Sequence, residues 1–188
     1  MTWHATEDSD TPDMLQIVVM GVSGCGKSTM ASAIAEALEL DMADGDDFHL
    51  PESIGKMRAG IALDDADRWP WLDRIGHYLA AGAATPHGRV VACSALKRAY
   101  RERIRALVPQ VRFVFLDGKV DLIRERLALR TGHYMQADLL ASQFSTLERP
   151  TPDEADVTTL DIAQPVEQVV AEAVKALTAL EALQTRPL

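Results

Sequence analysis

The chain has 188 residues, of which 47% are hydrophobic and 25% charged, and its formal net charge is −9. This length and composition are typical of one globular domain and exclude fibrous and intrinsically disordered proteins. The longest apolar run that could enter a membrane, residues 15–20, is far shorter than the ~18 residues that a transmembrane helix needs. We therefore expect no membrane partner.

The N-terminal segment and the cysteines bear on processing and compartment. Residues 1–13 are rich in Asp and Glu and lack the basic and apolar regions of a signal peptide, so we expect a disordered tail before a single domain over residues 14–188. Two cysteines, Cys25 and Cys93, are too few for a disulfide framework in a chain of this size. They indicate a reducing compartment, and we predict a cytoplasmic protein.

The basic residues are unevenly distributed along the chain. An acidic protein lacks the positive charge with which nucleic-acid-binding proteins neutralise phosphates, so we expect no nucleic-acid partner. Ten of the 19 Lys and Arg residues nevertheless lie between Lys97 and Arg130. Such a local basic patch suits a small anionic ligand, although the solvated faces of two helices would carry the same charges.

Apolar runs of β-branched residues alternate with segments of helical periodicity. Pro70 fits the first turn of the third predicted helix, where a backbone N–H is not needed. The alternation predicts an α/β fold, with a parallel sheet, helices on both of its faces, and a ligand site at the carboxyl ends of the strands. We predict strands near 15–20, 40–43, 90–93, 111–116 and 156–161, and helices near 27–39, 51–59, 67–82, 97–108, 119–131, 137–148 and 165–184.

Residues 21–28 read Gly-Val-Ser-Gly-Cys-Gly-Lys-Ser and match the phosphate-binding loop G-x-x-x-x-G-K-[ST] between a predicted strand and a predicted helix. In such loops backbone N–H groups surround phosphate oxygens, the lysine bridges the β- and γ-phosphates, and the serine hydroxyl binds Mg²⁺. We predict a nucleoside triphosphate here, with Lys27 catalytic and Ser28 a metal ligand. The predicted nucleotide contacts are Gly21, Val22, Ser23, Gly24, Cys25, Gly26, Lys27, Ser28 and Thr29.

Cys25 lies inside this loop, at the start of the following helix. A helix N-terminus can lower the pKa of a thiol, so we expect a reactive cysteine that bound nucleotide protects from alkylation. The loop by itself does not separate a kinase from a GTPase or a regulatory ATPase.

Asp44 and Asp46 follow the second predicted strand and are separated by one glycine. One carboxylate can approach Mg²⁺ while the other reaches an acceptor hydroxyl, an arrangement that suits phosphoryl transfer to a small alcohol. We assign Asp44 to the metal and Asp46 to the acceptor as a catalytic residue, although which aspartate is the general base stays open. A plain turn is the alternative for this sequence.

Arg126 and Arg130 are four residues apart, on one face of a predicted helix, directly before Thr131-Gly132-His133. We predict that both are catalytic, at the base of a mobile cover that brings positive charge over the transferring phosphate. An exposed helix face is the alternative. The histidines and cysteines show no metal-ligand spacing, so we assign no zinc site.

Together these segments resemble the gluconokinase family, small phosphate-loop kinases related in fold to shikimate and nucleoside monophosphate kinases. The resemblance implies a three-layer fold with a five-stranded parallel sheet, a mobile lid at about 131–137, and a loop at Gln164 and Pro165 that contacts adenine. It also implies a homodimer that uses ATP and Mg²⁺ to phosphorylate D-gluconate to 6-phospho-D-gluconate. The resemblance rests on residues 20–28, 44–46, 49, 56–57, 60, 63–68, 70–72, 93–97, 100–101, 130–133, 142–144, 146–148, 161–162 and 164–165.

An anionic sugar acid requires cationic and hydrogen-bonding side chains. Besides Asp46, we predict Arg68, Lys97, Arg101 and His49 as substrate-binding residues, because an arginine binds a carboxylate with two hydrogen bonds and because Arg101 follows Lys97 by one helical turn. A salt bridge to a neighbouring aspartate is the alternative for Arg68, and a turn cap is the alternative for His49. A small-molecule kinase acting on shikimate or adenylylsulfate, or a nucleotide-dependent regulatory module, stays open as the alternative function.

Overall fold

The computed structural model describes residues 14–83, 85, 87–129 and 137–184 of the chain. The predicted tail, residues 1–13, lies outside the described residues. Five parallel strands form one sheet in the order β2-β3-β1-β4-β5, which confirms the predicted α/β class and the parallel sheet. The strands are β1 (Gln16–Met20), β2 (Asp41–Asp44), β3 (Arg89–Ala92), β4 (Arg112–Asp117) and β5 (Val157–Asp161).

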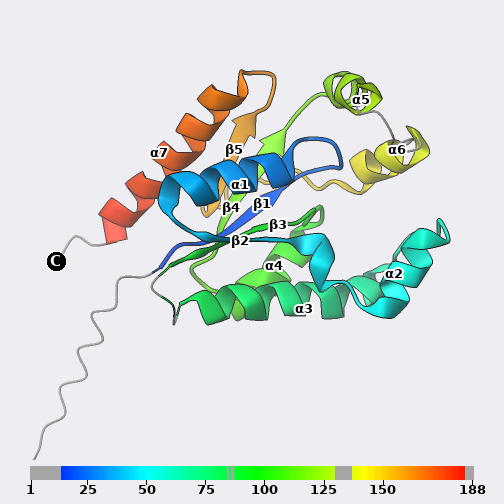
Figure 1. The fold of residues 1–188 in the computed structure, drawn as a ribbon, viewed down its shortest axis with the longest axis horizontal. Coiled ribbons are helices and arrows are strands. Elements are labelled where there is room, and N and C mark those ends of the chain that lie inside the picture. The colour runs from blue at the N-terminus through cyan, green and yellow to red at the C-terminus, as the bar shows by residue number, and fades with distance from the viewer. Residues whose placement is uncertain (1–13, 84, 86, 130–136, 185–188) are drawn as a thin grey trace, which may run out of the picture.

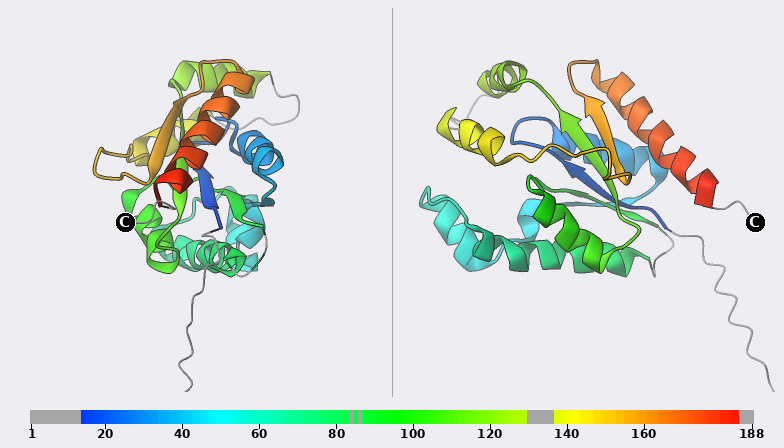
Figure 2. Two further views of the ribbon diagram at one scale, coloured as in Figure 1. Left: turned by 90° about the vertical axis from the view of Figure 1, so that its left-hand side faces the viewer. Right: turned by 180° about the vertical axis from the view of Figure 1, so that it is seen from behind.

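Helices cover both faces of the sheet, as Figure 1 and the two further views in Figure 2 show. The helices α1 and α7 pack on one face and α3 and α4 on the other. No helix in the described ranges is long and apolar enough to cross a membrane. The helices are α1 (Lys27–Leu38), α2 (Pro51–Arg58), α3 (Asp65–Gly82), α4 (Arg98–Leu107), α5 (Val120–Ala128), α6 (Ala137–Thr146) and α7 (Val166–Gln184).

The central strand β1 explains why its sequence is a continuous apolar run. Ile17 and Val19 point into the core cluster beneath α1 and α7, whereas Val18 and Met20 point into the cluster beneath α3 and α4, and all four are at most 1% exposed. A parallel strand covered on both faces buries every side chain, so its pattern does not alternate with polar residues. Because β1 is packed on both faces, its carboxyl end is held in place, and the phosphate-binding loop begins there.

Helix α3 begins earlier than predicted, which changes the interpretation of Pro70. The Asp64 side chain accepts a hydrogen bond from the Asp67 N–H (2.9 Å) and the Asp67 side chain accepts one from the Asp64 N–H (3.2 Å), a reciprocal cap that starts the helix at Asp65. Pro70 is consequently the sixth residue of the helix, and the prediction that it lies in the first turn is wrong.

A short 3-10 turn, η1 (Gly45–Phe48), follows β2, in the segment for which a plain turn was the alternative. Asp44 caps this turn, because its Oδ1 accepts a hydrogen bond from the Asp46 N–H at 3.0 Å. A Cβ atom at Gly45 would lie 2.5 Å from the carbonyl oxygen of Ala92, so only glycine fits against the neighbouring strand there. The turn holds Asp44, Asp46 and His49 at the carboxyl edge of the sheet.

Candidate active site

The loop between β1 and α1 has the tight form that phosphate binding requires. Gly21 has φ 143°, and a Cβ atom there would lie 2.8 Å from the Cys25 Sγ and 3.0 Å from the Leu116 carbonyl oxygen. Gly26 precedes α1 with φ 101°, a left-handed conformation that side chains rarely adopt, although the space around it is open. Both glycines let the backbone turn sharply, so that the first N–H groups of α1 face the carboxyl edge of the sheet.

Lys27 and Ser28 open the helix that follows the loop. The Lys27 Nζ donates a hydrogen bond to the Val22 carbonyl oxygen at 3.0 Å, so its side chain folds back across the loop. The hydroxyl of Ser28, an exposed residue, donates to the Asp44 Oδ2 at 2.8 Å, and the neighbouring Thr29 is also exposed. The structure therefore brings the end of β2 against the start of α1.

Asp44 and Asp46 play different parts although they are two residues apart. Asp44 uses both carboxylate oxygens, one for the Ser28 hydroxyl and one for the Asp46 N–H, whereas the Asp46 side chain is 88% exposed. A hydroxyl and a carboxylate are the hard oxygen ligands that Mg²⁺ prefers. Within the described ranges no three His, Cys, Asp or Glu side chains gather into a metal site.

His49 packs beneath this edge of the sheet. Its ring stacks on Trp71 with 4.6 Å between the ring centroids and 7° between the planes, and Trp71 donates from Nε1 to the Gly45 carbonyl at 2.6 Å. The Nε2 of His49 lies 3.9 Å from the Asp46 Oδ1, and its buried Nδ1 has no hydrogen-bond partner within the described residues. Burial lowers the pKa of His49, which Asp46 opposes and Arg68 reinforces. His49 is therefore neutral at pH 7.

A second polar cluster lies where α3 and α4 begin. The Lys97 Nζ donates to both carboxylate oxygens of Asp65, at 2.7 and 2.9 Å, and the Tyr100 hydroxyl donates to the same carboxylate. These hydrogen bonds lower the pKa of Asp65, those from Lys97 first and the one from Tyr100 next. Asp65 therefore stays ionised and holds Lys97 in place.

Arg68 lies near the same tyrosine. Its Cζ is 5.9 Å from the centroid of the Tyr100 ring, and the Lys97 Nζ is 5.4 Å from that centroid. Arg68 makes no salt bridge within 4.0 Å to a described residue, although its charge is one of the causes that lower the pKa of the neighbouring Asp65. Two cations thus lie near one aromatic ring, and of the two only Lys97 makes a salt bridge among the described residues.

Arg101 does not belong to this cluster, and its prediction as a substrate-binding residue is corrected. The residue is 1% exposed, and its guanidinium donates from Nε and Nη2 to the two carboxylate oxygens of Glu154 at 2.7 and 2.6 Å. Lys97 is the N-cap of α4 and has an extended backbone, so its side chain does not share a helix face with Arg101. The buried guanidinium leaves no surface for a sugar acid.

Arg126 contacts the loop that was predicted to receive adenine. Its Nη2 donates to the Ile162 carbonyl oxygen at 2.6 Å, and the Ile162 N–H donates to the Asp117 carbonyl at 3.0 Å. Gln164 is half-buried, and the carbonyl of Pro165 accepts hydrogen bonds from the first turn of α7. Arg130 and residues 131–136 of the predicted lid lie outside the described residues, whereas residue 137 begins α6.

The expectation that the helix N-terminus lowers the pKa of Cys25 is wrong. Its side chain is 2% exposed, and burial raises the pKa of the thiol more strongly than the nearby Lys27 lowers it. Burial also raises the pKa of Cys93, to about 12. The sequence showed that Cys25 stands next to a helix N-terminus, but it did not show how deeply the thiol is buried.

Two contacts of the site were not predicted. The Ser23 N–H donates a 2.5 Å hydrogen bond to Oε1 of Gln143 on α6, which lies 120 residues further along the chain. The second is the contact of Asp65, whose carboxylate accepts hydrogen bonds from Lys97 and Tyr100. Both stand in segments that carry the family resemblance, and that was the one signal available for them.

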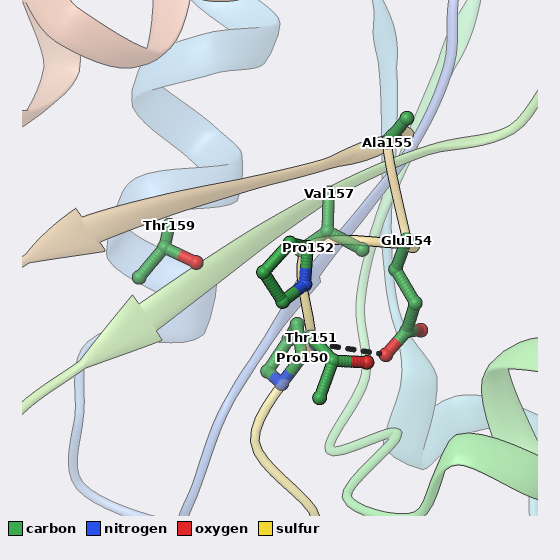
Figure 3. Close-up of a pocket in the computed structure, with 7 residues that line it drawn as sticks. All are labelled: Pro150, Thr151, Pro152, Glu154, Ala155, Val157 and Thr159. Carbon is green, nitrogen blue, oxygen red and sulfur yellow. Dashed lines mark hydrogen bonds between the residues drawn. The ribbon is translucent and has the colours of Figure 1, made fainter.

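Two surface hollows lie outside the phosphate-binding loop. One, of about 300 Å³, is lined by residues between Pro150 and Thr159, and Figure 3 shows the Thr151 N–H hydrogen-bonded to the Glu154 carboxylate in its wall. The other, of about 480 Å³, lies between Trp69 of α3 and Arg103 of α4. Neither is lined by a residue of the phosphate-binding loop, so the candidate active site is the edge of the sheet and not these hollows.

The chain is similar to known kinases over most of its length. The family model described as shikimate kinase matches residues 23–178. The thermoresistant gluconokinase of Escherichia coli (strain K12) is 42% identical over 160 residues, which are 85% of this chain and 91% of that protein. The gluconokinase of Gluconobacter oxydans (strain 621H) is 44% identical, with 82% and 85% of the two chains covered.

Solved structures agree with the sequence relatives. The crystal structure of a gluconokinase from Sinorhizobium meliloti 1021 superposes with a TM-score of 0.83 at 45% identity and covers 94% of this chain and 99% of that one. The fold described here is therefore shared with a solved structure that bears a kinase name.

Proposed function

Because the chain belongs to the gluconokinase family, we propose that it transfers the γ-phosphoryl group of ATP to the 6-hydroxyl of D-gluconate and releases 6-phospho-D-gluconate and ADP. One observation carries the proposal from the structure: the Ser28 hydroxyl contacts Asp44 while the Asp46 carboxylate stands exposed beside them. This edge of the sheet thus combines a phosphate-binding loop, oxygen ligands for Mg²⁺, and a carboxylate free to meet an acceptor.

Each residue of the site has a separate task in the transfer. Mg²⁺, held by Ser28 and Asp44, would neutralise charge on the β- and γ-phosphates. The Lys27 ammonium stabilises the negative charge that grows as the bond between the γ-phosphorus and the ADP oxygen breaks. Asp46 orients the 6-hydroxyl and accepts its proton as the sugar oxygen bonds to phosphorus. Arg126 and Arg130 are proposed to add positive charge at the nucleotide.

The sugar acid is proposed to bind on the side of the site where α3 and α4 begin. Arg68 has no ion-pair partner in the described ranges, and its planar guanidinium suits two hydrogen bonds to a carboxylate. Lys97 is fixed by Asp65 and offers its remaining N–H group to the same ligand. His49, buried and neutral, is proposed to support Asp46 and a sugar hydroxyl.

The remaining expectations are the nucleotide contacts, the assembly and the compartment. We propose that ATP lies along residues 21–29 with adenine near Gln164 and Pro165, and that the protein is a cytoplasmic homodimer. Two free, buried cysteines fit a reducing compartment. Light scattering coupled to size-exclusion chromatography measures the oligomeric state, and a monomeric mass would remove the dimer from the proposal.

A panel of acceptors measured by coupled ADP release tests the proposed reaction. D-gluconate is expected to give the highest kcat/KM of the panel. Shikimate and adenylylsulfate are the alternative acceptors to compare, since the shikimate kinase model also matches the chain. Lys27→Ala should abolish turnover, whereas Lys175→Ala, at an exposed position on α7, should leave it unchanged. Slow ADP release that no acceptor accelerates would instead identify a nucleotide-dependent regulatory module.

A further inference from the structure

One peptide unit of the phosphate-binding loop is held from both sides. The carbonyl oxygen of Val22 accepts a hydrogen bond from Lys27, and the N–H of Ser23 donates one to Gln143. This carbonyl and this N–H belong to the same peptide bond, and the described residues contain no cis peptide. In a trans peptide the two groups point in opposite directions. Lys27 and Gln143 therefore lie at opposite edges of one peptide unit.

Gln143 is held in place by the packing of its helix. Leu140 of α6 is 3% exposed and belongs to the same core cluster as Val22 of the loop, and Phe144 and Leu147 pack against that cluster. Residues three apart share a helix face, so Gln143 lies on the packed side of α6 with Leu140. Just beyond the helix, the Leu147 N–H donates to the Gln143 carbonyl at 2.9 Å. Figures 1 and 2 show α6 beside the loop between β1 and α1 from opposite directions.

The chemistry of this contact depends on one atom of the Gln143 side chain. A backbone N–H is a donor, so its partner must be an acceptor, and the carboxamide oxygen of Gln143 fulfils this at 2.5 Å. A glutamate at this position would supply an acceptor at the same reach. A methionine would fill a similar space with only a weak acceptor.

We propose that Gln143 is a positioning residue for Lys27, an inference that rests on the proposed kinase function. By holding the Ser23 N–H, Gln143 fixes the rotation of the Val22–Ser23 peptide, so that the Val22 carbonyl faces the Lys27 ammonium. That carbonyl sets where the ammonium stands relative to the transferring phosphate. The helix that follows the predicted lid thereby determines the geometry of the phosphate-binding loop.

Three variants test this proposal. Gln143→Met removes the acceptor and should lower kcat about tenfold, because a displaced catalytic cation loses much of its effect. Gln143→Glu keeps the acceptor and should retain kcat within about threefold at saturating ATP. Ser145→Ala, which removes only a local hydrogen bond to the Ser142 carbonyl on the exposed side of α6, is the matched control. The KM for gluconate should change less than about twofold in all three.

Hydrogen exchange of residues 21–28 supplies a measurement that does not depend on the acceptor substrate. Exchange at the Ser23 amide should accelerate in Gln143→Met and stay slow in Gln143→Glu and Ser145→Ala. If wild-type protein fails to phosphorylate gluconate, this pattern still tests the role of Gln143. Unchanged kcat and exchange in Gln143→Met would overturn the proposal. So would a lower kcat in Gln143→Glu than in Gln143→Met, because Gln143 would then act as a donor to an anion.

Discussion

The Ser28 hydroxyl donates a 2.8 Å hydrogen bond to the Asp44 Oδ2 and so joins the start of α1 to the end of β2. We expect Asp44→Asn to raise the Mg²⁺ concentration at half-maximal rate about tenfold, because an amide oxygen is a weaker ligand for Mg²⁺ than a carboxylate. Titration of MgCl₂ at fixed ATP measures the effect. Asp41→Asn, at the other end of the same strand, is the control. An unchanged Mg²⁺ dependence in Asp44→Asn would remove Asp44 from the metal site.

Asp46→Asn should lower kcat by roughly 10² to 10⁴, the range for loss of a general base, while the KM for ATP changes less than about threefold. Steady-state kinetics with gluconate and ATP measure both values. Asp47→Asn provides a matched control, since Asp47 is the next residue in η1 and is also exposed. If both variants keep the wild-type kcat, another group accepts the proton.

Arg101→Met should destabilise the fold without weakening substrate binding. It leaves the Glu154 carboxylate buried with Arg105 as its one remaining ion-pair partner among the described residues, and breaking a buried ion pair costs about 3 to 5 kcal/mol in the free energy of unfolding. Arg103→Met removes a salt bridge in which the arginine is 48% exposed and should cost less than about 1 kcal/mol. Urea unfolding measures both. A gluconate KM that rises only in Arg101→Met would restore its predicted role as a substrate ligand.

The same buried pair predicts a loss of stability in acid. Hydrogen bonds from Arg101 first, and from Arg105 after it, lower the pKa of Glu154 to about 2 against the opposing effect of burial. The folded pKa lies below the unfolded value of ~4.3, so the stabilisation is complete above that value and is lost as the pH falls from about 5 toward 2. Urea unfolding at pH 7, 5, 4 and 3 should show a shallower decline for Glu154→Gln than for wild type. If the free energy of unfolding falls equally with pH in Glu154→Gln and wild type, other carboxylates cause the acid sensitivity.

Both cysteines should resist alkylation in the folded protein. Burial raises the pKa of Cys25 and of Cys93, so at pH 8 neither thiol forms appreciable reactive thiolate. Mass spectrometry after iodoacetamide treatment should show little modification in buffer and complete modification in urea. Rapid alkylation of Cys25 that ATP prevents would contradict the burial seen here.

The sequence by itself determined the strands and the phosphate-binding loop, because each is formed by one contiguous stretch of residues. The glycines and Lys27 of residues 21–28 predicted a phosphate-binding loop, and the structure has that loop between β1 and α1. The apolar runs predicted five strands, and all five are present in one parallel sheet. The spacing of hydrophobic residues and the residue types of turns are properties of neighbouring residues, so they can be recognised without knowledge of the tertiary structure.

The tertiary structure decided which side chains meet across long separations. Arg101 pairs with Glu154, 53 residues away, and Ser23 with Gln143, 120 residues away, and no local pattern specifies either partner. Burial likewise reversed the expected reactivity of Cys25, because desolvation depends on every element packed around the thiol. Hydrogen bonds and burial between distant segments exist only after the sheet and its helices have packed, and for that reason the sequence by itself could not assign them.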